Sequence, residues 1–466
     1  MRAHDEDVDL CHFRPYFLVC QHFGCDLLVA REPRARIAVQ TEGVFMSGPS
    51  RRSAPWVVAA ALVAAALFAG AATAASGDAS TDDPTADGAA PDPTLSVSLA
   101  YEFLDARVDQ FCDGAGHCLP RSYEGGFFTD LPTWDFTPSF VYDDALVVIA
   151  YTARGLPDDI RRAQAVGDTL LFVQENDPIG DGRVRTSYEP HGIRQGRVEI
   201  TGPGTFTGNQ AWVGMALARL FHATGEQKYL DGALQLAQWI QTNTADMVRA
   251  PFGYTGGQLE NGSSLEWKST EHNSDLAGFF TQLAELTGDP VWGERAAVAS
   301  GFVAAMQSAD GHVDTGTLLD GSTVNTRPIP LDAQTWSSLA TGDPRYDTSL
   351  DWTLDNLIAT DGPYQGPSIS DTDVSKVWFE GSGHLALALR LRDAPGDADR
   401  AEALLSSIRL GQRDAANGDG KGIVATSTDG LDSGFGDLYY ASLHTGATAW
   451  YLLAAAGDNP FQLPAD

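Results

Sequence analysis

The sequence predicts an all-α protein arranged as an (α/α)6 toroid, in which six inner helices form a ring inside six outer helices. Two observations carry this prediction. From Tyr142 onward one unit recurs at a spacing of roughly 45–65 residues, which is typical of stacked helix pairs. Each unit holds an almost wholly apolar helix, a turn that often reads TGD or TGE, and a second helix that is apolar on one side only.

The apolar helices fit the inner ring and the one-sided helices fit the outer ring. We expect the inner helices to begin near Tyr142, Asn209, Thr270, Leu331, Trp378 and Leu443. We expect the outer helices at 94–111, 158–175, 226–241, 290–307, 345–358 and 397–412. One domain, 95–466, then accounts for every helix. Because helices alternate direction along the chain, the inner helices run parallel and their N-termini meet at one rim.

A targeting segment precedes this domain. After Met46 the chain has two arginines, Arg51 and Arg52, then an apolar run and a small-residue cleavage site, so we expect a secretory signal peptide at 46–75. The paired arginines also fit twin-arginine export. We therefore expect a secreted, extracellular protein.

The segments on either side of the signal peptide carry no periodic pattern. We expect residues 1–45 to come from a misplaced start codon; the alternative is a short cytoplasmic tail ahead of a signal anchor. Residues 76–94 are rich in Pro, Asp, Ser and Thr, and this composition predicts a disordered linker.

The acidic composition limits the partners. Asp and Glu number 62 against 30 Lys and Arg, for a formal net charge of −32. Such a surface repels nucleic acid and anionic membranes. We expect a monomer with no nucleic-acid partner and no membrane contact after signal cleavage. The sequence has no Gly-rich phosphate loop followed by Lys and Ser or Thr, and we expect no cofactor.

Two cysteines remain in the domain, Cys112 and Cys118, separated by a Gly-containing loop. In an exported protein this spacing predicts a local disulfide. The alternative is a metal site formed with His117, but the histidines are scattered and we expect no metal. The segments 177–182 and 417–422 lack the full spacing of a calcium loop and predict turns.

Polar and aromatic side chains gather where the inner helices are expected to begin. They are Asp143, Asp144, Asn209, Gln210, Trp212, Trp267, Lys268, Glu271, His272, Asn273, Asp275, Asp332, Gln334, Trp336, Trp378, Glu380, His444 and Trp450. Helix capping explains single Asp or Asn residues at such positions. It does not explain why Trp, His and Glu recur beside them.

Carbohydrate recognition explains this mixture better. Sugar rings stack on indoles, and sugar hydroxyls pair with carboxylates, amides and imidazoles. Cleavage of a glycosidic bond then needs two carboxyl groups, one to protonate the leaving oxygen and one to activate water or attack the anomeric carbon. The rim can supply both from different helices.

The repeat, with carboxylates at the starts of its inner helices, resembles the six-hairpin glycosidase superfamily. The segments KSTEHNSDL, LDAQTW, VWFEGSGHLALALRL and HTGATAW are similar to secreted bacterial proteins known only as glycosyl hydrolases of no numbered family. The resemblance implies the toroid and a carbohydrate-active enzyme. The fold hosts hydrolases, lyases and epimerases, so no catalytic position carries over from it.

The catalytic candidates are ranked by their own surroundings. Glu271 ranks first because His272 is adjacent and Asp275 lies one turn away on the same face. Glu380 ranks second because Phe379 precedes it, and an aromatic setting raises a carboxyl pKa as a general acid requires.

Asp143 ranks third, as a base or a partner of a substrate hydroxyl; Asp144 is its substitute, and Asp332 follows. We expect Glu380 as the acid and Glu271 or Asp143 as the base. We expect a further set of residues at the helix starts to bind substrate: Asp144, Asn209, Gln210, Trp212, Trp267, Lys268, His272, Asp275, Asp332, Gln334, Trp336, Trp378 and His444.

Three alternatives remain. A polysaccharide lyase would use a base from His272, His444 or Tyr142, with Lys268 neutralising a uronate. A sugar epimerase would use His272 and His444 as an acid–base pair, although export argues against it. A glycan-binding protein would have no catalysis at all.

Overall fold

A computed structural model describes residues 90–112, 116–129 and 136–465. The expected leading segment 1–45 and signal peptide 46–75 lie outside the described residues, as does most of the expected linker. The last two residues of that linker are helical, because helix α1 begins at Pro93, capped by the Asp92 side chain.

Helices dominate the structure, and the all-helical character expected from the sequence is confirmed at the level of a mostly α fold. The helices are α1 (Pro93–Phe111), α2 (Val141–Arg154), α3 (Pro157–Glu175), α4 (Pro190–Arg194), α5 (Thr207–Thr224), α6 (Gln227–Asn243), α7 (Thr270–Thr287), α8 (Pro290–Ala305), α9 (Leu331–Thr341), α10 (Asp347–Asn356), α11 (Phe379–Arg392), α12 (Asp397–Asp414) and α13 (Thr445–Ala456). The 3-10 turns are η1 (Gly126–Phe128) and η2 (Pro344–Tyr346).

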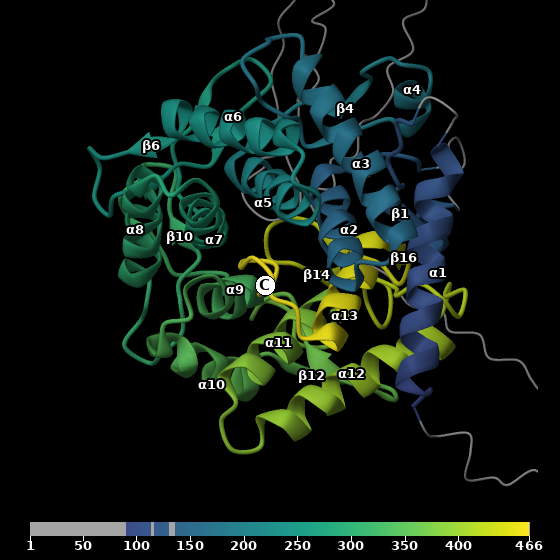
Figure 1. Ribbon diagram of the computed structural model, residues 1–466. Coiled ribbons are helices and arrows are strands. Elements are labelled where there is room, and N and C mark those ends of the chain that lie inside the picture. The colour runs from purple at the N-terminus through teal and green to yellow at the C-terminus, as the bar shows by residue number, and fades with distance from the viewer. Residues whose placement is uncertain (1–89, 113–115, 130–135, 466) are drawn as a thin grey trace, which may run out of the picture. The chain divides into compact units, whose positions relative to one another are not determined.

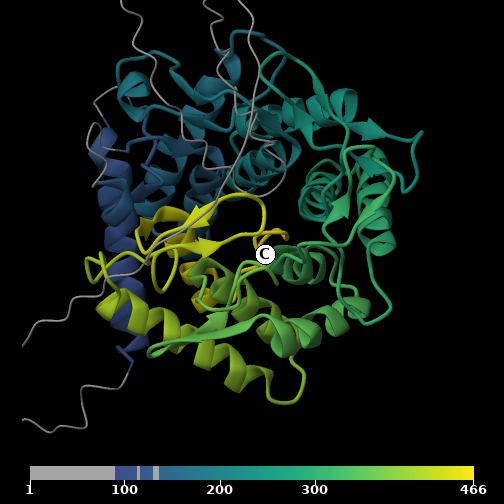
Figure 2. The same cartoon turned by 180° about the vertical axis from the view of Figure 1, so that it is seen from behind.

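Six helices contact one another in a closed cycle. In order around the cycle they are α2, α5, α7, α9, α11 and α13, and α13 contacts α2 again. Figure 1 shows these six helices surrounded by the others, and Figure 2 shows the same arrangement from behind. Their first turns and middles are almost fully buried, as expected for helices that are apolar on every side.

Each helix of the cycle also packs mainly against one outer helix. Helices α3, α6, α8, α10 and α12 pack on the inner helix that precedes each of them, and α1 packs on α13. The outer helices bury one face, as the one-sided pattern predicts; α6, for example, buries Leu230, Leu236 and Ile240.

The TGD turns explain how an inner helix ends and the following outer helix begins. Gly288 ends α7 in the left-handed conformation (φ 67°), which glycine adopts without strain. The Asp289 side chain then accepts a hydrogen bond from the Val291 amide (3.0 Å) and caps α8, with Pro290 at its first position. One tripeptide therefore stops one helix and starts the next.

Short strands occupy the connections. They are β1 (Tyr123–Glu124), β2 (Ser139–Phe140), β3 (Ser187–Tyr188), β4 (Ile200–Gly202), β5 (Thr205–Phe206), β6 (Ala245–Asp246), β7 (Gly253–Tyr254), β8 (Gly257–Gln258), β9 (Ser264–Leu265), β10 (Gly316–Thr317), β11 (Val324–Asn325), β12 (Ile358–Asp361), β13 (Tyr364–Pro367), β14 (Leu431–Asp432), β15 (Leu438–Tyr439) and β16 (Leu443–His444). All pair antiparallel in sheets of two or three strands. β1 pairs β16 and so joins the start of the domain to its end.

The C-terminal tail inserts among the helices of the cycle (Figure 1). Phe461 is fully buried, and its ring lies 5.2 Å from the Trp212 ring and 5.9 Å from the Trp336 ring. Arg219 holds the tail by bonds to the Asp458 carboxylate (2.6 Å) and the Asn459 carbonyl (2.5 Å). The tail thus forms part of the core.

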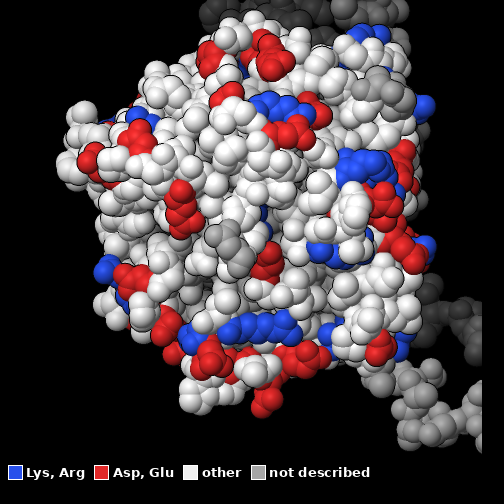
Figure 3. Space-filling model, in the orientation of Figure 1, with Lys and Arg blue, Asp and Glu red and all other residues white. Residues whose placement is uncertain are grey.

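Covalent and charged features complete the fold. A disulfide joins Cys112 to Cys118, with Cα atoms 4.7 Å apart. Figure 3 shows acidic side chains spread over one face among basic ones. In the described part of the chain, no helix is both long enough and apolar enough to cross a membrane.

Candidate active site

The second residue of each inner helix defines the site. These residues are Tyr142, Gly208, Glu271, Asp332, Glu380 and Gly446. Four of them line one pocket, namely Tyr142, Gly208, Glu271 and Glu380. The N-termini of four inner helices therefore converge, and they bring together carboxyl groups that lie more than a hundred residues apart in sequence.

The pocket has about 10 Å³ of free space, roughly the room that one water molecule needs. Its other lining residues are Asn209, Trp212, His272, Trp336 and Tyr439. It combines carboxyl, imidazole, amide and phenol groups with two indoles. A lining of this chemical make-up suits a polyhydroxylated ligand better than an apolar one.

Glu380 is held by two neighbours. The Tyr142 hydroxyl donates a hydrogen bond to its Oε1 (2.7 Å), and Nδ1 of His444 lies 3.4 Å from its Oε2. Burial raises the pKa of Glu380 to about 7, against the lowering effects of His444 and Tyr142, while Asp143 raises it further. Glu380 therefore changes charge near neutral pH.

Glu271 has acidic surroundings instead. Burial raises its pKa well above the usual value, and Asp332, Asp275 and Glu380 raise it further. Burial and Asp332 also raise the pKa of Asp275, while contact with the Trp212 indole lowers it in part. Burial and these acidic neighbours therefore favour the protonated form of Glu271.

Two polar groups of the pocket are open to a ligand. Among the residues that the structure describes, neither Oε2 of Glu271 nor the indole N–H of Trp336 has a hydrogen-bond partner. Glu271 is 7% exposed and Trp336 is 2% exposed. Buried polar groups are usually paired, so these two favour a ligand that supplies the missing bonds.

Asp143 and His444 lie behind Glu380. Nε2 of His444 is 3.3 Å from Oδ1 of Asp143, and both side chains are fully buried. The His444 ring stacks on Tyr123 with centroids 4.2 Å apart. Burial lowers the pKa of His444, but Asp143 and Glu380 outweigh it and raise the pKa overall. A Cβ at Gly446 would lie 2.5 Å from Asp143, so this position has room only for glycine.

A layer of aromatic residues lies one helical turn below, at the sixth residue of each inner helix. Trp212, Trp336, His384 and Trp450 occupy this layer, together with Leu146 and Asp275. Trp450 donates a hydrogen bond from Nε1 to the Tyr142 hydroxyl (2.8 Å) and so orients the tyrosine that binds Glu380.

In three inner helices, the fourth residue carries a side-chain amide that bonds to the backbone of a connecting segment. Both ends of the Gln210 amide bond to the Val184 backbone (2.9 Å each), and the Gln334 amide does the same with Val313 (2.8 Å each). Asn273 holds the Tyr254 backbone in the same way. The side-chain amides of Gln210 and Gln334, which were expected to bind substrate, are thus bonded to the backbone of loops.

Other expected ligands also lie away from the pocket. Nζ of Lys268 donates to three backbone carbonyls and pairs with Asp246 (2.9 Å). Asp144 accepts a hydrogen bond from Ser139 (2.7 Å), and burial raises its pKa.

The remaining expected ligands support the pocket from beside or below. Trp267 packs beside His272, with ring centroids 5.5 Å apart, and Trp378 packs on His384 at 5.1 Å. Asp332 is fully buried and accepts a hydrogen bond from the Ala333 amide (2.6 Å).

Sequence reasoning did not single out Tyr439, His384 or Phe461. Aligning the inner helices by their first residues places His384 level with Trp212 and Trp336, and this signal could have found it. Tyr439 belongs to a strand pair outside the repeat, and no periodic signal marks it. In the residues described, no group of three or more His, Cys, Asp or Glu side chains is arranged to hold a metal ion.

Solved structures share this fold. No protein-family model and no curated protein matches the sequence. A D-mannose isomerase matches with a TM-score of 0.59 at 10% identity, over 82% of this chain and 99% of that one. A wild-type glycosidase matches at 0.55 and 14% identity, over 80% and 98%. An alpha-amylase from Clostridium perfringens matches at 0.53 and 10% identity, over 78% and 97%. At such identities these likenesses establish a common fold.

Proposed function

We propose that this chain is a secreted glycoside hydrolase with an (α/α)6 toroid fold, acting on an oligo- or polysaccharide. The closed cycle of six helices, each packed mainly on one outer helix, supports the toroid. Several proteins with a similar fold are carbohydrate-active enzymes by name, including a glycosidase and an alpha-amylase. Export rests on the signal sequence expected at 46–75.

One observation carries the proposal. Glu271 and Glu380 line the same buried pocket, with the indoles of Trp212 and Trp336 beside them. Two carboxyl groups with different surroundings are what glycosidic bond cleavage needs, and indoles suit the apolar face of a sugar ring.

The surroundings of the two carboxyl groups differ, and we assign their roles in catalysis from that difference. Burial and the surrounding acids raise the pKa of Glu271 and favour its protonated form, so it is suited to protonate the leaving oxygen. Glu380 has Tyr142 and His444 to stabilise its anion, so it is suited to activate water or attack the anomeric carbon. These roles reverse those suggested by the aromatic neighbour of Glu380 in the sequence.

A lyase fits less well. Of the three bases that a lyase could use, Tyr142 is unsuited, because burial and Glu380 raise its pKa well above the usual value. Lys268 would have to neutralise a uronate, yet its ammonium is committed to three carbonyls and Asp246.

The first test is hydrolysis of a panel of aryl glycosides and oligosaccharides by the full chain. We expect Glu380→Gln to lose about 10²–10⁴-fold in kcat/KM on every substrate. Glu271→Gln should lose activity on 4-nitrophenyl glycosides but retain most of it on 2,4-dinitrophenyl glycosides, whose leaving group needs no proton.

The matched control is Glu285→Gln, an exposed carboxylate on the same helix as Glu271, which should leave both rates unchanged. An unsaturated product absorbing in the ultraviolet would replace the proposal with a lyase. Interconversion of free hexoses without hydrolysis would replace it with an isomerase or epimerase, and binding without any product would leave a glycan-binding protein.

A further inference from the structure

Asp275 is the acidic member of the aromatic layer beneath the pocket. It is the sixth residue of α7, a position that the other inner helices fill with Trp, His or Leu. Its side chain is fully buried and lies one helical turn below Glu271, so the two carboxyl groups share one face of α7. Burying a carboxyl group costs free energy unless a partner compensates, so this acid requires an explanation.

No partner compensates the burial of Asp275 within the described residues. Neither of its carboxyl oxygens accepts a hydrogen bond there, and no Lys or Arg side chain acts on it. The first turn of α5 comes close on one side, because a Cβ at Gly208 would lie 2.9 Å from Oδ2 of Asp275. The carboxyl group is therefore confined against α5 without a cation to neutralise it.

The two carboxyl groups of α7 differ in what acts on them. Burial raises the pKa of Glu271, and the groups that raise it further are all acids: Asp332, Asp275 and Glu380. Burial and Asp332 also raise the pKa of Asp275, but the Trp212 indole favours its anion. Asp275 is therefore the better placed of the two to carry a negative charge, and Glu271 is the better placed to carry a proton.

The arginines on the elements around α7 are held elsewhere. Helices α5, α8 and α9 and strand β7 pack against α7, and so does the C-terminal tail. With α7 itself, these elements carry the titratable groups Arg219, His222, Tyr254, His272, Glu285, Glu294, Arg295, Asp332 and Asp458. Arg219 binds Asp458 of the tail (2.6 Å), and the Arg295 guanidinium lies 4.4 Å from the centre of the Trp292 ring. Asp332 acts on both carboxyl groups of α7 and adds a further acid to them.

We propose that Asp275 is a positioning residue that keeps the proton on Glu271, so that Glu271 can protonate the leaving oxygen. This inference rests on the proposed hydrolase and adds a residue that does not line the pocket. A carboxylate confined one turn below a carboxylic acid disfavours a second negative charge beside it. In each turnover Glu271 gives its proton to the glycosidic oxygen as that bond breaks. Water supplies the hydroxyl that the anomeric carbon gains, and its remaining proton replaces the one that Glu271 gave.

The test compares the pH profile of kcat/KM for the wild-type protein and Asp275→Asn on 4-nitrophenyl glycosides. Asn has nearly the shape of Asp but no charge, so the basic limb, where Glu271 loses its proton, should move to lower pH by about 1 unit or more. The acidic limb should stay in place, because the acids that act most on Glu380 are Asp143 and Asp332. On 2,4-dinitrophenyl glycosides, whose leaving group needs no proton, the basic limb should not move.

A second measurement needs no substrate. Infrared difference spectroscopy follows the carbonyl band of the protonated carboxyl group that Glu271→Gln removes. In Asp275→Asn this band should disappear at lower pH than in the wild-type protein. Glu285→Gln, an exposed acid on the same helix, is the matched control and should leave both the band and the basic limb unchanged.

The outcomes separate the inference from the proposed function. A basic limb and a carbonyl band that both stay in place in Asp275→Asn, with only kcat lowered, would overturn the inference while leaving a hydrolase. No hydrolysis of any glycoside by the wild-type protein would contradict the proposed function, and the infrared titration would still decide whether Asp275 keeps the proton on Glu271. Should Asp275→Asn fail to fold, Asp275→Ser removes the same charge and takes its place in both measurements.

Discussion

At the scale of single residues, His444 links two carboxyl groups that the sequence presents as independent candidates. It lies between Asp143 on α2 and Glu380 on α11, under the ring of Tyr123. Asp143 does not line the pocket, so it acts on Glu380 through the imidazole. We therefore interpret Asp143 and His444 as positioning residues.

Replacing His444 should change the pH dependence of activity. A cation near a carboxyl lowers its pKa by about 1–3 units. His444→Asn removes the imidazole that lies between Glu380 and Asp143 and whose cationic form lowers the pKa of Glu380. Because Glu380 acts as an anion in the proposed hydrolysis, we expect the acidic limb of kcat/KM to move upward from near pH 7 by about 1 unit.

The matched control is His191→Asn, an exposed histidine outside the site. An acidic limb that stays in place while kcat falls would reduce His444 to a packing role. If kcat/KM instead fell on the basic side with a pKa near 7, Glu380 would have to be protonated to act, and its role would be that of the general acid.

The sequence predicts which residue types gather at the helix starts, but it does not predict which way each side chain points. Successive helical residues point about 100° apart, so neighbours at a helix start face different surroundings. Glu271 therefore reaches the pocket, while Asn273, two residues later, holds the Tyr254 backbone. Gln210 and Gln334 likewise use their polar side chains to hold loop backbone.

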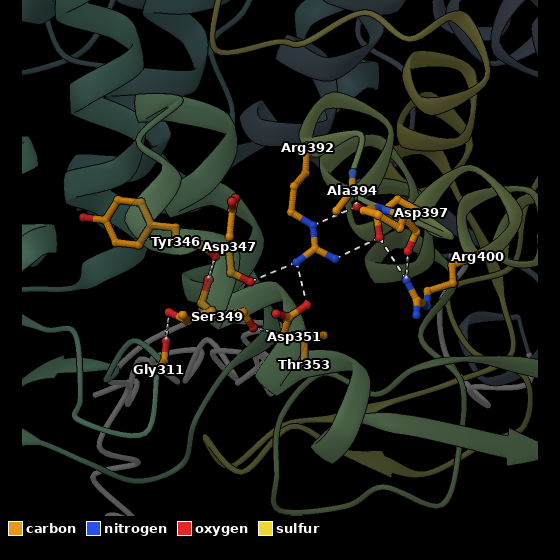
Figure 4. Close-up of polar contacts among 12 residues, drawn as sticks. Gly311, Tyr346, Asp347, Ser349, Asp351, Thr353, Arg392, Ala394, Asp397 and Arg400 are labelled. Atoms are coloured by element: carbon orange, nitrogen blue, oxygen red, sulfur yellow. Dashed lines mark hydrogen bonds and ion pairs between the residues drawn. The ribbon is translucent and has the colours of Figure 1, made fainter.

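At the scale of elements, one turn recurs between inner and outer helices. Arg392 at the end of α11 donates two hydrogen bonds to Asp397 at the start of α12 (2.7 and 2.8 Å), and Asp397 also accepts from the Ala394 amide (3.0 Å; Figure 4). Arg154 and Asp159 repeat this arrangement between α2 and α3. Each pair fixes the angle of a helix hairpin.

Removing this carboxylate should destabilise the fold. Hydrogen bonds to charged groups contribute about 1.5–3 kcal/mol, so Asp397→Asn should lower the free energy of unfolding by about 2–3 kcal/mol at pH 7. Burial raises the pKa of Asp397, but Arg392 and the Ala394 amide lower it overall. Its contribution is therefore complete above the unfolded pKa of about 4 and is lost as pH falls below it.

Urea unfolding at pH 7 and pH 3 measures this effect, and the difference between variant and wild type should shrink at pH 3. Asp399→Asn, an exposed change in the same turn of α12, should have no effect at either pH. Equal losses at both pH values would mean that the charge of Asp397 is not what stabilises the hairpin.

At the scale of the whole molecule, the order of the helices could be predicted from the repeat. The expected inner helix at Thr270 begins at that residue, and the one expected near Tyr142 begins one residue earlier. The strand pairs and the C-terminal tail could not be predicted, because they follow no period. Tyr439 and Phe461 reach the site from these parts, so its shape depends on segments outside the repeat.

The tail supports the pocket from below, and Phe461 is the residue that tests this. Its ring packs on Trp212 and Trp336, which line the pocket, and a Cβ at Gly278 would lie 2.9 Å from it. Truncating a buried Phe to Ala costs about 3–5 kcal/mol because a cavity remains. We expect Phe461→Ala to lower the free energy of unfolding by that amount and to lower kcat/KM, since both indoles lose a support.

Phe461→Leu fills most of the space and should recover most of both quantities, while Gln462→Ala, an exposed neighbour, should change neither. Urea unfolding and glycoside hydrolysis measured on the same preparations separate the two effects. A Phe461→Ala protein of wild-type stability would place the tail outside the core. One that loses stability but keeps its kcat/KM would show that Trp212 and Trp336 hold their positions through the ring of helices alone.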